Sequence, residues 1–196
     1  VLVAPTDDNV PGLTPRLALK RPGDRIFLGS KVAGRYTLAP VVDPSRTCIF
    51  FSTGTGEAPH NAMVTELLRK GHHGPMVSAV TVRQWDDLGY RSEHEKLDAR
   101  YPNYHYLPLP TREPDFPKTY LQDVVSKGML SSHYGIELDP DTTDVFLCGN
   151  PSMIGLPEGD PEEWPEAKGV VELLTKRGFK LDRRGDPGNI HFEEYW

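Results

Sequence analysis

Glycines stand where the chain could approach a phosphate closely. Gly54 and Gly56 flank Thr55, directly after the apolar run 47–53 and directly before a stretch with helical spacing. Glycine lets a backbone pass close to a ligand, and a helix N-terminus offers unpaired N–H groups to an anion. The turn lacks the full G-x-G-x-x-G pattern, and such a turn is often only a tight connection. Glu57 follows it, and this carboxylate would repel a phosphate unless it pointed away.

Cationic side chains follow the next two extended runs. Arg83 comes directly after "AVTV" and Arg91 after "DDLGY", whereas Arg112 and Lys118 follow "YHYLPLP". A guanidinium group can bind two phosphate oxygens at once. Any one of these cations alone is typical of a solvated surface, but several at one edge of a sheet indicate a phosphate site. A site for NAD would more typically have an acidic residue where Arg83 stands.

Two features near the C-terminus could take part in chemistry. Cys148 and Gly149 end the apolar run in "FLCGNPSMI". A cysteine nucleophile needs a histidine partner, and no nearby spacing offers one, so a small buried thiol is the plain alternative. The chain ends on Tyr195 and Trp196. This aromatic pair could fill an edge of the core or lie over a flat ring, and composition does not decide between the two.

Strands must bring these residues to one place. Extended runs at 47–53, 75–83, 104–111, 143–150 and 189–196 alternate with helical spacing at 60–71, 92–101, 119–130 and 166–179. This alternation predicts an α/β fold with a parallel sheet covered on both faces. Such sheets bind ligands beyond the carboxyl ends of their strands, where the glycines, the cations and Cys148 stand. Two further short strands, 23–30 and 34–40, are expected upstream.

Composition narrows the function classes. The chain has 196 residues and a net charge of −6, which argues against nucleic acid as a partner. No apolar stretch approaches the roughly 20 residues that a membrane-spanning helix needs, so we expect no membrane association. Two cysteines, Cys48 and Cys148, fit a reducing compartment, and we expect a cytoplasmic protein without a metal site. The abrupt opening "VLVAPTDDNVPG" suggests that the chain begins inside a larger protein.

The motifs in combination resemble the ferredoxin–NADP reductase family. "GTGEAP", "TVRQWDDLGYRSE", "TRE" with "KTY", "CGNPSM" and "EEYW" occur in that family's order, and "GLTPRLALKRPGDRIFLGSKVAGRYTL" is similar to the end of its flavin-binding barrel. The resemblance covers nearly the whole chain. It implies that residues 1–42 are the remnant of an antiparallel FAD-binding barrel and that residues 43–196 form a five-stranded parallel NADP-binding domain.

The resemblance also implies roles for individual residues toward NADP. The turn Gly54, Thr55 and Gly56 would face the pyrophosphate. Three residues, Thr111, Arg112 and Lys118, would hold the 2′-phosphate, with Arg83 matching an arginine that bacterial members use for the same group. Tyr120 would stack on the adenine. The other cofactor-binding positions that it implies are Thr53, Arg91, Gly149, Asn150 and Met153.

For the reaction itself, the resemblance implies that electrons pass between ferredoxin or flavodoxin and NADP(H) by hydride transfer through FAD. Cys148 would lie near the nicotinamide and the flavin N5, and Glu193 would join it in proton relay or in stabilising the hydride-transfer complex. Trp196 would cover the flavin and give way to nicotinamide, and Thr14 would contact the FAD pyrophosphate.

The sequence departs from the family in several places. The flavin motif Arg-x-Tyr-Ser/Thr is absent, so we expect most of the barrel to be missing and FAD to bind weakly or not at all. Glu57 and His60 stand where members usually have an apolar and an aromatic residue, and the segment 155–168 is longer and more acidic than usual. Two alternatives stay open: the NAD(P)H-dependent reductase component of an oxygenase, and a non-catalytic nucleotide-binding module, against which the terminal aromatic residues argue.

Overall fold

The computed structural model describes residues 13–31, 33–159 and 163–195. It divides the chain into two compact units, Val1–Arg35 and Tyr36–Trp196. The described residues of the first unit contain one short helix, α1 (Leu13–Ala18), and no strand. The second unit contains all five strands and the remaining helices of the described chain.

The two upstream strands that we expected at 23–30 and 34–40 are not formed, so that prediction is wrong. Ile26, Phe27 and Leu28 are exposed, with Phe27 95% accessible. An isolated pair of strands is marginal in water, because it needs a third strand or a packed face, and the described residues supply neither here. The structure therefore gives no support for a barrel remnant, and the domain division 1–42 and 43–196 stays a prediction.

The second unit is built on a five-stranded sheet in the order β3-β2-β1-β4-β5. Its strands are β1 (Thr47–Thr53), β2 (Met76–Val82), β3 (Tyr104–Pro110), β4 (Thr143–Gly149) and β5 (Ile190–Glu194). Every neighbouring pair is parallel, which confirms the predicted fold class. β1 lies between β2 and β4, so the chain winds from β1 toward one side of the sheet and later returns to the other. The carboxyl ends of β1 and β4 therefore flank the point at which the strand order reverses.

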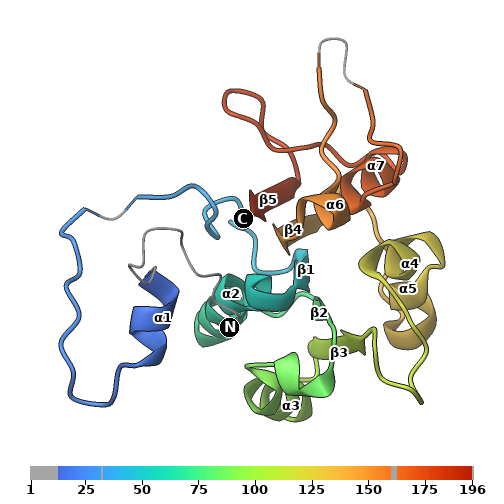
Figure 1. The fold of residues 1–196 in the computed structure, drawn as a ribbon. Coiled ribbons are helices and arrows are strands. Elements are labelled where there is room, and N and C mark those ends of the chain that lie inside the picture. Colours follow the sequence, from blue (N-terminus) through green and yellow to red (C-terminus); the bar gives the residue numbers. More distant parts are fainter. Residues whose placement is uncertain (1–12, 32, 160–162, 196) are drawn as a thin grey trace. The chain divides into compact units, whose positions relative to one another are not determined.

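Helices cover both faces of this sheet (Figure 1). One face packs against α2 (Glu57–Arg69) and α3 (Arg91–Arg100), and the side chains of Phe50 and Phe146 stack there with ring centroids 5.2 Å apart. The other face, which carries Ile49 and Phe51, packs against α4 (Leu121–Ser126), α5 (Met129–Tyr134), α6 (Pro151–Ile154) and α7 (Val170–Thr175). Strands buried on both faces read as continuous apolar runs, which is why the sequence pattern identified them.

Glycines set the limits of two predicted helices. The stretch 119–130 forms two helices rather than one, because Gly128 adopts a left-handed backbone with φ 63° between α4 and α5. The stretch 166–179 yields only α7, which begins after Gly169. That glycine lies so close to Gly155 that a Cβ atom on it would stand 2.4 Å from the Gly155 Cα.

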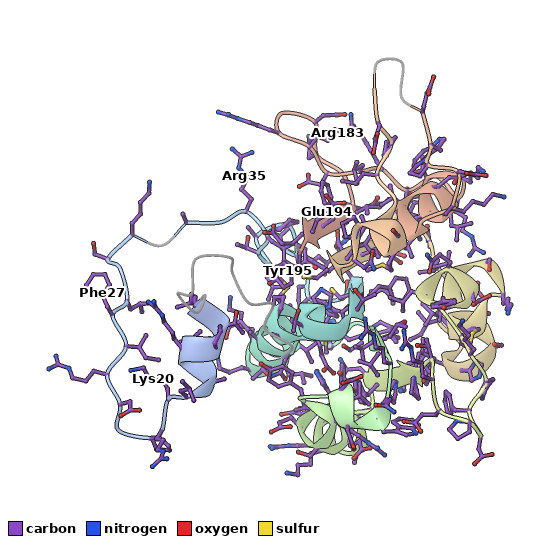
Figure 2. All side chains as sticks on the ribbon, viewed as in Figure 1. Lys20, Phe27, Arg35, Arg183, Glu194 and Tyr195 are labelled. Atoms are coloured by element: carbon purple, nitrogen blue, oxygen red, sulfur yellow. The ribbon has the colours of Figure 1, made fainter. Side chains whose placement is uncertain are left out.

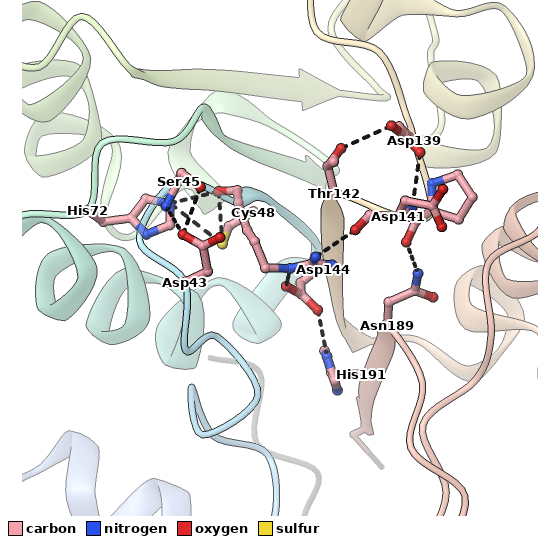
Figure 3. A network of polar contacts seen from close by, with 12 residues as sticks. Asp43, Ser45, Cys48, His72, Asp139, Asp141, Thr142, Asp144, Asn189 and His191 are labelled. Atoms are coloured by element: carbon pink, nitrogen blue, oxygen red, sulfur yellow. Dashed lines mark hydrogen bonds and ion pairs between the residues drawn. The ribbon is translucent and has the colours of Figure 1, made fainter.

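A buried polar network closes the amino-terminal edge of the sheet, opposite the strand ends at which ligands are expected. Figure 3 shows the Asp144 carboxylate and the His191 ring pointing toward one another. Asp144 Oδ2 lies 2.6 Å from Arg46 Nε, and Asp144 Oδ1 lies 3.5 Å from His191 Nε2. Burial acts to raise the pKa of Asp144, but the hydrogen bonds from His191 and Arg46 outweigh it, and the net pKa is lowered.

We expect Asp144→Asn to lower stability at pH 7 by about 3 kcal/mol, because it leaves Arg46 without its buried counter-charge. A carboxylate with a lowered folded-state pKa stabilises the protein above its unfolded pKa, and this contribution is lost as the pH falls below about 4. Urea unfolding between pH 3 and pH 7 should therefore show a smaller decrease in stability toward acid for the variant than for the wild type. The exposed Asp141→Asn is the control, and an unchanged pH dependence in Asp144→Asn would contradict this account.

Candidate functional site

The ends of β1 and β4 touch through glycines at the point where the strand order reverses. A Cβ atom on Gly56 would stand 2.2 Å from the carbonyl oxygen of Cys148, and one on Gly149 would stand 2.2 Å from Thr53 Oγ1. Gly54 has a left-handed backbone with φ 52°. The reversal point of a parallel sheet is where such folds bind ligands, so the turn at 54–56 faces the expected crevice.

Hydrogen bonds fix the backbone on the β4 side of this crevice. The backbone N–H of Asn150 donates to Thr53 Oγ1 at 2.7 Å, which joins the two strand ends directly. Asn150 Oδ1 in turn accepts from the backbone N–H of Ser152 at 2.8 Å and caps α6. Met153 is buried beneath this cap, whereas Asn150 is exposed. Of the predicted cofactor-binding residues, Asn150 and Thr53 are thus well placed and Met153 can act only through packing.

Glu57 turns away from the glycine turn. Its side chain is buried at 2% exposure and accepts a hydrogen bond from the Tyr106 hydroxyl at 2.7 Å. Burial raises the pKa of this carboxyl, against the opposing effect of its bonds to Tyr106 and the Tyr90 backbone. The repulsion that the sequence suggested between Glu57 and a phosphate is therefore reduced, because the carboxylate points into the protein.

The loops after β2 and β3 run side by side. Both the backbone N–H and the hydroxyl of Thr111 donate to the Val82 carbonyl at 2.9 Å, and the Arg112 N–H donates to the Arg83 carbonyl at 2.8 Å. Arg83 and Arg112 are exposed. These contacts bring Arg83, which is far away in the sequence, beside Thr111 and Arg112 at one edge of the sheet.

Aromatic residues stand beside the cations at this edge. Arg91 lies over the Trp85 ring, with its guanidinium carbon 4.6 Å from the ring centroid, and Trp85 packs edge-on against Phe116. Lys118 Nζ lies 5.3 Å from the centroid of Tyr120, whose ring is 44% exposed. Cations beside aromatic rings suit a ligand that carries both a phosphate and a flat base.

A second group of residues gathers where β4 and β5 end. Cys148 and Glu193 are direct partners in the register of these strands. The Tyr195 N–H donates to the Gly149 carbonyl at 3.0 Å, which places Tyr195 beside the end of β4. Burial raises the pKa of Cys148 to about 11, so it is a neutral thiol at neutral pH and is unsuited to nucleophilic attack. Figure 2 shows Tyr195 and Glu194 at this end of β5.

Sequence reasoning missed a tyrosine at this end of the site. The half-buried Tyr36 has its hydroxyl 2.6 Å from His60 Nε2, and it lies within electrostatic reach of Cys148, Tyr195 and Glu193. His60 is fully buried, and burial lowers its pKa to about 3, so the ring is neutral. The unusual histidine at position 60 was the signal in the sequence, but its partner lies 24 residues away.

Two predicted residues have no established place in the site. Thr14 belongs to α1 in the first unit, and Trp196 lies outside the described residues. Within the described parts of the chain, no three potential metal ligands gather into a site. No helix among those residues is both long and apolar enough to cross a membrane.

Comparison with known proteins connects this geometry to a family. Residues 50–158 match the family model for the oxidoreductase NAD-binding domain. The chain is 27% identical over 191 residues to ferredoxin–NADP reductase A of Sorangium cellulosum, covering 93% of this chain and 64% of that protein. It is also 27% identical over 179 residues to the electron transfer component of toluate 1,2-dioxygenase from Pseudomonas putida, covering 91% of this chain and 44% of that protein. The chain thus spans less than two thirds of either relative.

A solved structure shares the fold. The ferredoxin NADP⁺ reductase of Neisseria gonorrhoeae, solved with bound FAD and NADP, superposes with a TM-score of 0.67 at 18% identity, over 84% of this chain and 61% of that one. At this identity the likeness concerns the fold alone. It agrees with the parallel sheet described above, which is the arrangement of the NADP-binding part of such reductases.

Proposed function

The chain belongs to the oxidoreductase NAD-binding domain family, and on that basis we propose that it holds NADP(H) along the carboxyl edge of its sheet for hydride exchange with FAD. The observation that carries the proposal is the close approach of the carboxyl ends of β1 and β4 at the point where the strand order reverses. There Gly56 and Gly149 leave no room for a side chain, and the thiol of Cys148 lies next to Glu193. Exposed guanidinium groups stand at the other end of the same edge.

The residues fit separate parts of NADP. The turn 54–56 at the start of α2 suits the pyrophosphate, since the helix N-terminus and its free N–H groups attract anions. Arg83 and Arg112, with the Thr111 backbone fixed to Val82, suit the 2′-phosphate. Tyr120 offers an exposed ring for the adenine. The dinucleotide would then run along the sheet edge, with its nicotinamide directed toward Cys148.

At the nicotinamide end, the protein would orient the ring and place a neutral thiol and a carboxyl group beside it. The nicotinamide ring exchanges the hydride, and FAD, when bound, links that exchange to single-electron chemistry. Cys148, as a neutral thiol, would keep a small uncharged surface against the ring. Glu193 is exposed on β5, opposite Cys148 on β4, and would take part in proton relay beside the nicotinamide ring. The described residues contain no cradle for the flavin itself, so FAD as the second cofactor is proposed from the relatives.

Ferredoxin or flavodoxin is the proposed electron-transfer partner, in line with the reductase of Sorangium cellulosum. The similarity to the toluate dioxygenase component favours a second candidate, the delivery of electrons from NAD(P)H to an iron–sulfur oxygenase. The two candidates share the nucleotide site and differ in the acceptor protein. A purely non-catalytic module is disfavoured, because binding alone does not require Cys148, Glu193 and Tyr195 to meet at the nicotinamide end.

Calorimetric titration with 2′-AMP and 5′-AMP tests the nucleotide assignment. We expect 2′-AMP to bind at least about 10-fold more tightly than 5′-AMP. Each charge-assisted contact to a phosphate at the 2′ position contributes roughly 1.5–3 kcal/mol. Equal affinity for the two compounds would indicate a generic nucleotide site and would contradict the assignment of NADP. Lack of binding by both compounds would contradict the proposed function as a whole.

A further inference from the structure

A buried polar cluster lies directly behind the glycine turn. It consists of Glu57, Tyr106, His94 and Tyr104, all of them buried. Glu57 is the first residue of α2, His94 lies on α3, and the two tyrosines lie on β3. Polar groups cost free energy when they leave water unless they bond to one another. The contacts within this cluster at the first turn of α2 must therefore be identified.

Counting donors and acceptors shows one consistent arrangement of the contacts. Burial lowers the pKa of His94 to about 4, so its ring is neutral and has one N–H. The Tyr104 hydroxyl lies 2.6 Å from His94 Nδ1. When that hydroxyl donates to Nδ1, the ring N–H is on Nε2, which is buried without a hydrogen bond and stands 3.7 Å from Glu57 Oε1. The Glu57 carboxylate then faces two side-chain donors, His94 and the Tyr106 hydroxyl.

The cluster also links segments of the chain that carry different parts of the proposed nucleotide site. Glu57 follows Gly56 in the pyrophosphate turn, and its Oε1 lies 3.7 Å from Nε2 of His94 on α3. The His94 ring stacks on Tyr106, with centroids 4.7 Å apart and planes inclined by 15°. Burial raises the pKa of Tyr106 and the nearby charge of Arg91 lowers it, so this guanidinium lies within electrostatic reach of the same hydroxyl.

We propose that Glu57, Tyr106 and His94 are positioning residues that hold the pyrophosphate turn at one fixed spacing from α3 and from β3, the strand that precedes the proposed 2′-phosphate site, so that the pyrophosphate and the 2′-phosphate of NADP can bind together. This inference rests on the proposed function. A ligand that bridges two rigidly spaced sites gains affinity because its second contact is made within the complex. If the spacing becomes loose, the bridging ligand loses that advantage, whereas a fragment that occupies one end keeps its affinity.

Tyr106→Phe tests the proposal with two ligands. The variant removes one hydroxyl and leaves the ring that stacks on His94. We expect the Kd of NADP⁺ to rise about 10-fold, since a buried carboxylate loses a partner, while the Kd of 2′-AMP, whose phosphate reaches only Arg83 and Arg112, stays within about 2-fold. Retained 2′-AMP binding also shows that the variant is folded. An equal loss for both ligands, or no loss for either, would overturn the proposal.

Two further variants sharpen the result. Glu57→Gln keeps a side-chain oxygen for the Tyr106 hydroxyl, and the neutral His94 can exchange its tautomer, so NADP⁺ affinity should stay within about 3-fold of wild type. Tyr134→Phe is the matched control, because this half-buried ring stacks on His105 away from the turn, and it should change neither affinity. A loss of NADP⁺ affinity in Tyr134→Phe equal to that in Tyr106→Phe would overturn the proposal. Failure of the wild type to bind either ligand would instead refute the proposed function.

Discussion

Gly56→Ala should lower the affinity of the chain for NADP⁺ by about 100-fold. The added methyl group would stand 2.2 Å from the Cys148 carbonyl oxygen, which is backbone and cannot rotate away. The turn at 54–56 must therefore move from the end of β4, and we scale the expected loss on the roughly 100-fold in rate that a misplacement of about 1 Å can cost an enzyme. We also expect stability to fall by about 1–3 kcal/mol, as for other overpacked positions. Calorimetry with NADP⁺ and urea unfolding measure the two effects.

Gly89→Ala is the matched control for this substitution. Gly89 lies in the loop after β2, has no left-handed backbone and has open space around the position of a Cβ atom. The control should leave NADP⁺ affinity within about 2-fold, because a methyl group in open space meets nothing. If Gly56→Ala bound NADP⁺ as tightly as wild type, the nucleotide would not lie in the crevice between β1 and β4.

Arg112→Ala should weaken 2′-AMP binding by about 10- to 100-fold, which corresponds to one lost charge-assisted contact of roughly 1.5–3 kcal/mol. The affinity for 5′-AMP should not change. The Arg112 backbone N–H is bonded to Arg83, so the substitution removes the guanidinium while the loop keeps its main-chain contact. Titrations at increasing salt concentration should also show a weaker salt dependence of 2′-AMP binding in the variant.

Arg100→Ala serves as the control for Arg112→Ala. Arg100 is exposed at the end of α3 and lies over the Tyr101 ring, beyond the amino-terminal turn that carries Arg91. Its loss removes the same net charge from the protein and should leave 2′-AMP affinity unchanged. A similar weakening in both variants would mean that general electrostatic attraction, rather than a positioned guanidinium, holds the 2′-phosphate.

Much of the sheet could be predicted from the sequence, because its strands are buried on both faces and read as short apolar runs. That no strands form at 23–30 and 34–40 could not be predicted. The run around Phe27 has the composition of a strand, but strand formation depends on a partner that local composition does not reveal. Gly128 is visible in the sequence, yet nothing local showed that it would take the left-handed backbone that divides 119–130 into two helices.

In the site, too, some features could be predicted from the local sequence and others depend on contacts between residues far apart in the chain. The common location of the glycine turn, the cations and Cys148 follows from strand ends in a parallel sheet, whereas the proximity of Glu193 to Cys148 was implied only by the family resemblance. The sequence marked Glu57 and His60 as unusual without explaining them. Their partners Tyr106 and Tyr36 lie 49 and 24 residues away, and only the packing of β3 and of the segment before β1 brings them together.

The central claim is that NADP(H) lies along the carboxyl edge of the sheet with its nicotinamide at Cys148. A crystal structure of the chain with NADP⁺ bound tests it most directly. The account predicts the pyrophosphate at the turn 54–56, the 2′-phosphate between Arg83 and Arg112, and the nicotinamide beside Cys148. A dinucleotide bound at another surface, or one whose 2′-phosphate lies away from both arginines, would contradict it.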